Sequence, residues 1–222
     1  MLEGSERAMP TSVGDVGALA AIRGPYIEDA DGLGSVPPPG TAKGVLKSGV
    51  QMITGNRPEV FIDKLAERLA FERGGTRLYE ALMIKCLAGA DESSVIDWQK
   101  LEEIHGEEMR HFELVRQALE SVGADPTAMT PCANLTGVEA MGLVQVLNGP
   151  RTTIAQSVHS ILIAELADNA GWELLITLAN ELGHKRLSEQ FAAALAAEQE
   201  HLAQVKAWMQ ELTLGEAKML AA

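Results

Sequence analysis

The chain has 222 residues, of which 46% are apolar and 4% aromatic, and its formal net charge at pH 7 is -13. This excess of negative charge disfavours nucleic acids and anionic membrane surfaces as partners, because both would repel the protein. No segment approaches the ~20 consecutive apolar residues of a membrane span, and Cys86 and Cys132 form no C-x-x-C motif, so we expect a cytoplasmic protein without disulfides.

The first 57 residues differ in composition from the rest of the chain. They hold ten of the 21 glycines and five of the nine prolines. Glycine and proline disfavour a regular helix, so the sequence predicts an irregular N-terminal arm at 1–57. Apolar residues between Lys43 and Thr54 are numerous enough for part of this arm to pack on the folded domain; a disordered tail is the alternative.

Four long helices are predicted after the arm, because alanine, leucine and glutamate are abundant and apolar residues recur at helical spacing. They are expected at 58–88, 94–122, 152–182 and 188–212. Proline at position 58 favours a helix start, and Ser188 is the expected cap of the last helix. The sequence thus predicts an all-α domain at 58–212 and a short C-terminal tail at 213–222.

A long crossover separates the second predicted helix from the third. Asp125-Pro126 and Pro131 are expected to break it, and 138–147 is expected to form a short helix within it. The order is therefore two helical hairpins joined by a long connection, which is a known arrangement of four-helix bundles.

Two Glu-x-x-His motifs, Glu108 to His111 and Glu198 to His201, lie inside the second and fourth predicted helices. This spacing places the carboxylate and the imidazole one turn apart on the same helix face, where they can bind one metal ion. The two motifs belong to a longer internal repeat, because Val115-Arg116 follows the first as Val205-Lys206 follows the second.

The first and third helices repeat as well. Glu72 is followed by Tyr79-Glu80, and Glu165 is followed at the same distances by Trp172-Glu173. Residues of the first helix are offset by 93 from their counterparts in the third, and the two motifs are offset by 90. One helical hairpin is therefore used twice, and facing hairpins would bring two carboxylates and two motifs together.

Two other Glu-x-x-His pairs are set aside. Gly183 follows Glu181 where a helix stop is expected, so His184 would lie beyond the helix end. Glu102 and His105 correspond in the second copy to Ala192 and Leu195, which cannot bind metal. Equal depth on antiparallel helices also favours Glu108 over Glu102, because the midpoint between Glu72 and Glu108 falls in the predicted turn.

The six candidate metal ligands are Glu72, Glu108, His111, Glu165, Glu198 and His201. Their four carboxylates carry four negative charges, which two divalent cations would neutralise in the core. Mixed carboxylate and imidazole ligands favour iron or manganese over a metal that prefers thiolates.

Tyr79 and Trp172 lie seven residues after Glu72 and Glu165, near the same helix faces. Tyr79 is the candidate catalytic residue, offering a hydrogen bond to a ligand carboxylate or an electron. Core packing is the alternative for both aromatic residues. For Glu80 and Glu173, a polar contact to the metal ligands and a solvated position are both open. Cys86 is expected to be a small buried thiol.

These residues resemble the ferritin-like superfamily, specifically the rubrerythrin-type and bacterioferritin-type di-iron proteins, over about residues 58–212. The resemblance implies bridging roles for Glu108 and Glu198, and terminal roles for Glu72 and Glu165 with one histidine on each metal. Rubrerythrins carry a further carboxylate one turn after the third-helix ligand; Asp168 stands there, and its direct ligation stays open. No paired C-x-x-C motifs of a rubredoxin module are present.

The resemblance implies a two-iron site that reacts with O2 or hydrogen peroxide, as a ferroxidase or a peroxidase. An external electron donor would then be needed. Manganese catalase chemistry and non-catalytic iron storage are the alternatives, and storage requires a closed cage. We expect a homodimer or a larger homo-oligomer.

Overall fold

The computed structural model describes residues 14–38, 57–89 and 94–219. Six helices and no strands form the regular structure of these segments, which confirms the all-α prediction. No helix in them is long and apolar enough to cross a membrane. The chain divides into two units, Met1–Gly34 and Ser35–Ala222, which are described separately.

The first unit contains helix α1, Val16–Glu28, where an irregular arm was predicted. Asp15 begins it: the Asp15 carboxylate accepts a hydrogen bond from the Ala18 amide at 3.0 Å. An N-cap of this kind satisfies an amide that the helix itself leaves free. The prediction is therefore wrong for α1, although the helix includes Pro25 and buries no residue. The predicted apolar segment at 43–54 lies outside the described residues.

The first helix among the described residues of the second unit is α3, Pro58–Leu87, and it is followed by α4, Trp98–Val122. Asp97 accepts hydrogen bonds from the amides of Gln99 and Lys100 at 3.0 and 3.2 Å, so α4 starts four residues later than predicted. Gly123 ends α4 in the left-handed conformation with φ of 89°, which glycine adopts without strain.

The crossover contains a longer helix than predicted, α5, Pro131–Asn148. Pro131 was expected to break the chain, but it occupies the first helical turn, where its missing N–H costs no hydrogen bond. The Thr130 side chain caps this helix by accepting a hydrogen bond from the Ala133 amide. Pro131 therefore begins a helix at a position where the sequence predicted a break.

The second hairpin consists of α6, Ile154–Glu181, and α7, Lys185–Met219. Thr153 and Gln156 form a reciprocal capping box at the start of α6. Ser188 lies inside α7 and does not cap it, because Gly183 with φ of 76° makes the turn and the helix begins at Lys185. The predicted tail at 213–222 is wrong for residues 213–219, which continue α7.

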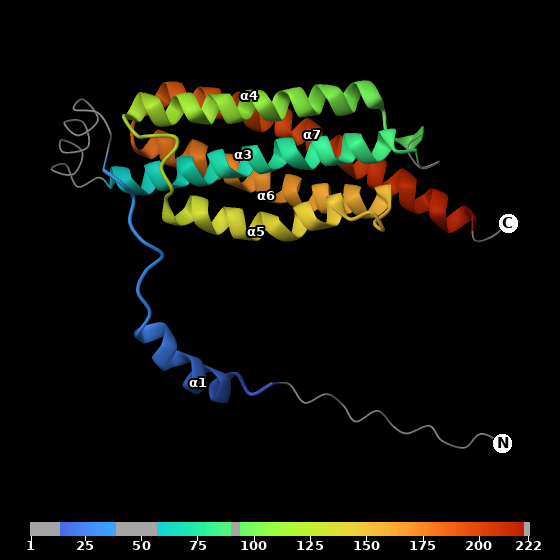
Figure 1. The fold of residues 1–222 in the computed structure, drawn as a ribbon. Coiled ribbons are helices and arrows are strands. Elements are labelled where there is room, and N and C mark those ends of the chain that lie inside the picture. The colour runs from blue at the N-terminus through green and yellow to red at the C-terminus, as the bar shows by residue number, and fades with distance from the viewer. Residues whose placement is uncertain (1–13, 39–56, 90–93, 220–222) are drawn as a thin grey trace, which may run out of the picture. The chain divides into compact units, whose positions relative to one another are not determined.

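The helices of the second unit pack as a bundle (Figure 1). The main pairs are α3 with α4 and α6 with α7; α3 also packs on α6, and α5 lies against both of them. Each of the four long helices passes from one apolar cluster to another. The first cluster includes Leu82, Ile104, Val158 and Trp208, and the second includes Leu65, Leu119, Trp172 and Phe191.

Between these two clusters each long helix carries buried polar side chains. On α3, for example, Leu65 belongs to the second cluster and Leu82 to the first, with Glu72 between them. Burying each large apolar side chain contributes about 1.5–3 kcal/mol, whereas an uncompensated buried carboxylate has the opposite effect. The apolar layers therefore hold in place a polar layer that would not stabilise the fold by itself.

Candidate metal centre

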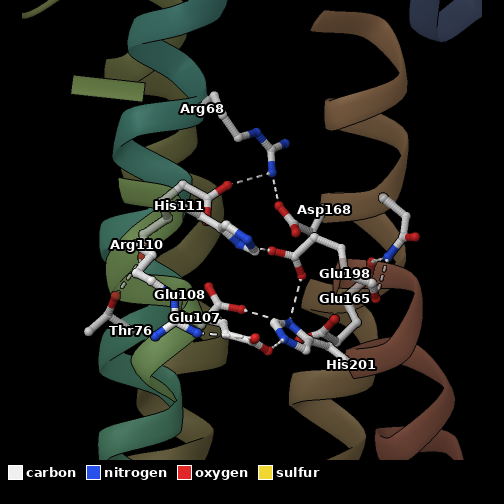
Figure 2. Close-up of polar contacts among 12 residues, drawn as sticks. Arg68, Thr76, Glu107, Glu108, Arg110, His111, Glu165, Asp168, Glu198 and His201 are labelled. Atoms are coloured by element: carbon white, nitrogen blue, oxygen red, sulfur yellow. Dashed lines mark hydrogen bonds and ion pairs between the residues drawn. The ribbon is translucent and has the colours of Figure 1, made fainter. Parts of the chain in front are cut away.

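All six predicted ligands lie in this polar layer, in two overlapping groups of buried atoms. Figure 2 labels all of them except Glu72. One group consists of Glu108, Glu165, Glu198 and His201. The other consists of Glu72, His111 and Glu198. Within each group the candidate ligand atoms lie within 4.8 Å of one another. Every member is at most 7% exposed, so water does not cover these charges. We call these the four-residue group and the three-residue group; Glu198 belongs to both.

His201 is the most closely surrounded member of the four-residue group. Its Nδ1 lies 3.0 Å from Glu198 Oε2 and 3.6 Å from Glu108 Oε1. Its Nε2 lies 2.8 Å from Glu107 Oε2 on the opposite side of the ring. A carboxylate at Nε2 fixes the ring orientation and favours a proton on that nitrogen, so Nδ1 faces the group and would bind a metal after losing its own proton.

The three-residue group is arranged around His111, whose Nδ1 lies 2.5 Å from Glu198 Oε1. The two atoms are close but not aligned as a hydrogen bond. The guanidinium of Arg68 lies at the edge of this group, with its Nη1 3.3 Å from Glu72 Oε1. Arg68 also forms an ion pair with Asp168, and its side chain is only 5% exposed. A permanent cation therefore lies beside Glu72.

Unsatisfied buried atoms indicate that the site is suited to cations. Buried atoms without a hydrogen-bond partner among the described residues include Glu72 Oε2, Glu165 Oε2, Glu198 Oε1 and His111 Nδ1. Buried polar atoms are nearly always hydrogen-bonded, so such a cluster needs an explanation. Each of these atoms can donate an electron pair to a metal, and carboxylate with imidazole suits iron or manganese. The residues present could therefore hold metal ions.

Burial is the largest influence on the ionisation of the carboxylates. It raises the pKa of Glu72 and Glu165 well above the usual range, and neighbouring carboxylates such as Glu108 act in the same direction. Burial also raises the pKa of Glu108. These groups therefore hold protons in the metal-free protein to higher pH than an exposed glutamate does.

The two central residues behave differently. Burial opposes ionisation of Glu198, but its contacts with His111 and His201 lower its pKa. Burial by itself would lower the pKa of His201, but Glu108, Glu198 and Glu107 together raise it to about 11. Without metal, an imidazolium thus supplies part of the positive charge that the carboxylates require.

Both predicted aromatic residues lie beside the site. Tyr79 is 1% exposed, and its hydroxyl donates a hydrogen bond of 2.5 Å to Glu165 Oε1. Burial and the charge of Glu165 raise the pKa of Tyr79 well above its usual range, so the phenol keeps its proton and remains a donor. Trp172 is fully buried, and its ring meets that of His111 edge-on at 5.7 Å.

The residues that were set aside lie apart from the two groups. His105 is within 3.4 Å of Glu80, and His184 stacks on Phe61 at 5.1 Å. The expectation that Cys86 is buried is confirmed. Asp168 belongs to neither group, because it pairs with Arg68.

Four residues that matter to the geometry were assigned no role from the sequence. Arg68 lies one helical turn before Glu72, and Glu107 directly precedes Glu108. Their positions close to predicted ligands in the sequence could have indicated a role at the site. Gly75 and Gly171 gave no signal, since their importance depends on neighbouring helices. A Cβ at Gly75 would collide with the Glu108 carboxylate, and a Cβ at Gly171 would collide with the Arg68 guanidinium.

A small apolar cavity borders the site on the side of α5. Its volume is about 200 Å³, and its walls include Gly74, Gly75, Leu78, Ala164 and Ala167. Gly75 therefore faces the cavity and also contacts the Glu108 carboxylate. Ala164 directly precedes Glu165 in the chain, but neither Glu108 nor Glu165 is itself among the residues that line the cavity.

Comparisons with protein-family models, with curated proteins and with solved structures find no match for this chain. What the residues themselves establish is an all-helical protein with a buried cluster of carboxylates and histidines that could bind metal ions.

Proposed function

We propose that the second unit is a ferritin-like four-helix bundle that binds two divalent metal ions, iron in the cell, and reacts with O2 or hydrogen peroxide. One observation carries this proposal. Six residues chosen from an internal repeat gather in two adjoining groups of buried ligand atoms. Ligands on four helices, with a Glu-x-x-His motif on two of them, characterise dinuclear carboxylate proteins.

Each ligand has a distinct role in this proposal. Glu198 belongs to both groups, as a carboxylate shared between two ions would. Glu108 is its partner in the repeat and the second bridging candidate. Glu72 with His111, and Glu165 with His201, supply the ligands that belong to one position each. The four carboxylate charges match two divalent ions, so ligands and ions can be buried together.

Two bound Fe(II) ions would supply the two electrons that cleavage of an O–O bond requires. The protein supplies the surroundings. Tyr79 holds Glu165 through a protonated phenol and keeps a proton beside the site. The apolar clusters on either side exclude bulk water, and the cavity beside Gly75 gives a small uncharged oxidant a place next to Glu108. An external reductant completes each cycle.

The test is the stoichiometry of oxidation. Anaerobic protein loaded with Fe(II) should consume about one hydrogen peroxide per pair of ions, and without a reductant the reaction should stop there. Glu198→Ala should lose this stoichiometry, because the residue serves both positions. Oxidation no faster than that of free Fe(II) in buffer would refute the oxidase function and leave metal binding alone.

The same experiment separates the alternatives. If the manganese-loaded protein evolves O2 from peroxide without a reductant while the iron form is inert, the activity is that of a catalase. A closed assembly seen by light scattering, with retained ferric iron, would instead indicate storage.

A further inference from the structure

Four positions beside the metal centre break the internal repeat. The six ligand positions match between the two halves of the chain. The unmatched pairs around them are Arg68 with Ile161, Gly75 with Asp168, Tyr79 with Trp172, and Glu107 with Ala197. The two halves of the site therefore have the same ligands but different surroundings.

The surroundings of Glu165 and His201 hold these ligands in position. Tyr79 donates to Glu165 at 2.5 Å, and Glu107 contacts His201 Nε2 at 2.8 Å. Glu107 is itself paired with Arg110 at 3.1 Å. Contacts of this kind to metal ligands raise metal affinity, because the ligands are oriented before the ion arrives.

The surroundings of Glu72 and His111 oppose a cation. Arg68 lies 3.3 Å from Glu72, and a buried guanidinium does not lose its charge. Arg68 is held there by Asp168 and by the ring of Phe71, whose centroid is 4.5 Å away. Gly171 leaves room for the guanidinium. Arg68 is therefore a fixed part of this half of the site.

The repeat also lacks a second copy of Glu107. The position equivalent to Glu107 is Ala197, whose side chain has no hydrogen-bonding group. In place of the Tyr79 hydroxyl, Trp172 presents an aromatic edge to His111. The two groups also differ in size. The group that contains His201 has four members, and the group that contains His111 has three.

We propose that the two metal positions are unequal, with the Glu165/His201 position filling first and retaining its ion, and the Glu72/His111 position binding an exchangeable second ion. Arg68 is the positioning residue that sets this difference, because its positive charge lies 3.3 Å from Glu72 Oε1, repels an incoming cation and leaves only Oε2 of that carboxylate to bind a metal. The inference rests on the proposed dinuclear site.

Cobalt(II) is a suitable probe, because it is stable in air and paramagnetic. Titration of metal-free protein should show two binding steps whose dissociation constants differ by about tenfold or more. Histidine ring NMR signals, assigned with His→Gln variants, should report the order. At one equivalent of cobalt the ring of His201 should show the large contact shifts of a coordinated histidine, whereas the ring of His111, with its centroid 6.0 Å from that of His201, should show only the through-space shifts of a nearby group. Two equal sites, or contact shifts at His111 before those at His201, would overturn the proposal.

Variants test the cause of the difference. Arg68→Gln combined with Asp168→Asn removes the cation together with the charge of Asp168, and it leaves Glu72 as the carboxylate that has lost its cation. The second cobalt ion should then bind about tenfold more tightly, while the dissociation constant of the first ion changes little. Arg116→Gln is the matched control, since Arg116 also pairs with carboxylates but lies on the surface of α4. An unchanged second constant in the double variant would overturn the role of Arg68.

Glu107→Ala provides an independent test if the double variant folds poorly. It should raise the dissociation constant of the first ion by about tenfold, within the range found for residues that hydrogen-bond to metal ligands, and leave the dissociation constant of the second ion unchanged. Equal weakening of both ions would contradict the assignment. Absence of any cobalt binding in the wild-type protein would refute the dinuclear function itself, which distinguishes that failure from two equal sites.

Discussion

The surroundings of individual residues distinguish the Glu-x-x-His pairs from one another. Glu108 and His111 are buried among the other ligands, whereas His105 lies near Glu80 outside the two groups. The repeat and the turn midpoint selected from the sequence the pair that lies in the buried groups, because both depend on backbone geometry. Arg68 could not be assigned in the same way, since a lone arginine on a helix is usually solvent-exposed.

Alanine variants at the two pairs should therefore behave differently. Glu108→Ala and His111→Ala each remove a buried ligand and should abolish binding of at least one ion. Glu102→Ala and His105→Ala are the controls, with the same residue types and the same spacing on α4. Equilibrium dialysis against Mn(II) measures the outcome, and loss of binding in the controls with retention in the first pair would reverse the assignment.

Tyr79 should stabilise the metal-free protein through Glu165. Tyr79→Phe leaves a carboxylate oxygen buried without its donor, and we expect a loss of about 1–3 kcal/mol in the free energy of unfolding. Tyr26→Phe is the matched control, since Tyr26 is exposed on α1. Chemical denaturation measures both, and equal small effects would show that the hydroxyl contributes nothing.

Among the elements, α3 shows most clearly what sequence alone could and could not predict. Its start at Pro58 and its apolar face follow from local rules. The pair Gly74-Gly75 inside it looks like a weakness, because each glycine destabilises a helix by about 1 kcal/mol relative to alanine. The reason for Gly75 is the carboxylate of Glu108 on α4, which only the tertiary structure reveals.

Two of the regions that were predicted wrongly share a physical cause. Pro131 begins α5 and Asp15 begins α1, because each is placed where a first turn tolerates or requires it. Proline and glycine content argued against helix in both regions. Caps act through single hydrogen bonds, so composition over a long segment does not detect them.

Gly75 and Gly74 offer a matched pair of substitutions within one helix. Gly74→Ala meets no atom within 4 Å and should stabilise the metal-free protein by about 0.5–1 kcal/mol. Gly75→Ala should gain less stability and lose metal affinity, because its Cβ displaces the Glu108 carboxylate. Thermal unfolding with and without Mn(II) measures both effects, and equal metal stabilisation in the two variants would contradict this account.

For the whole molecule, the buried charge links metal binding to pH. Glu72 and Glu165 have raised pKa values, and that of His201 rises from 6.5 to about 11. A group whose pKa is raised by folding binds more protons in the folded state, so its contribution is present below the unfolded pKa and is lost as pH rises. The metal-free protein should therefore lose stability progressively above pH 6.5 through His201.

Metal binding should reverse this trend, because ions replace protons at the ligands. The increase in melting temperature on adding Mn(II) is expected to grow as pH rises from about 6 to 8. Glu198→Ala provides the control, since it disrupts both positions and should show no such increase. A stabilisation by Mn(II) that falls with pH would mean that the raised pKa values do not belong to the metal ligands.

The most direct test of the dinuclear site is the metal content of the protein purified without added metal, compared with that of Glu198→Ala. Elemental analysis should find about two ions per chain in the wild-type protein, mainly iron, and a loss of both in the variant. The unsatisfied buried atoms of Glu72, Glu165, Glu198 and His111 support this expectation. A wild-type protein without tightly bound metal after dialysis against Fe(II), or a Glu198→Ala protein that keeps two ions, would contradict the account.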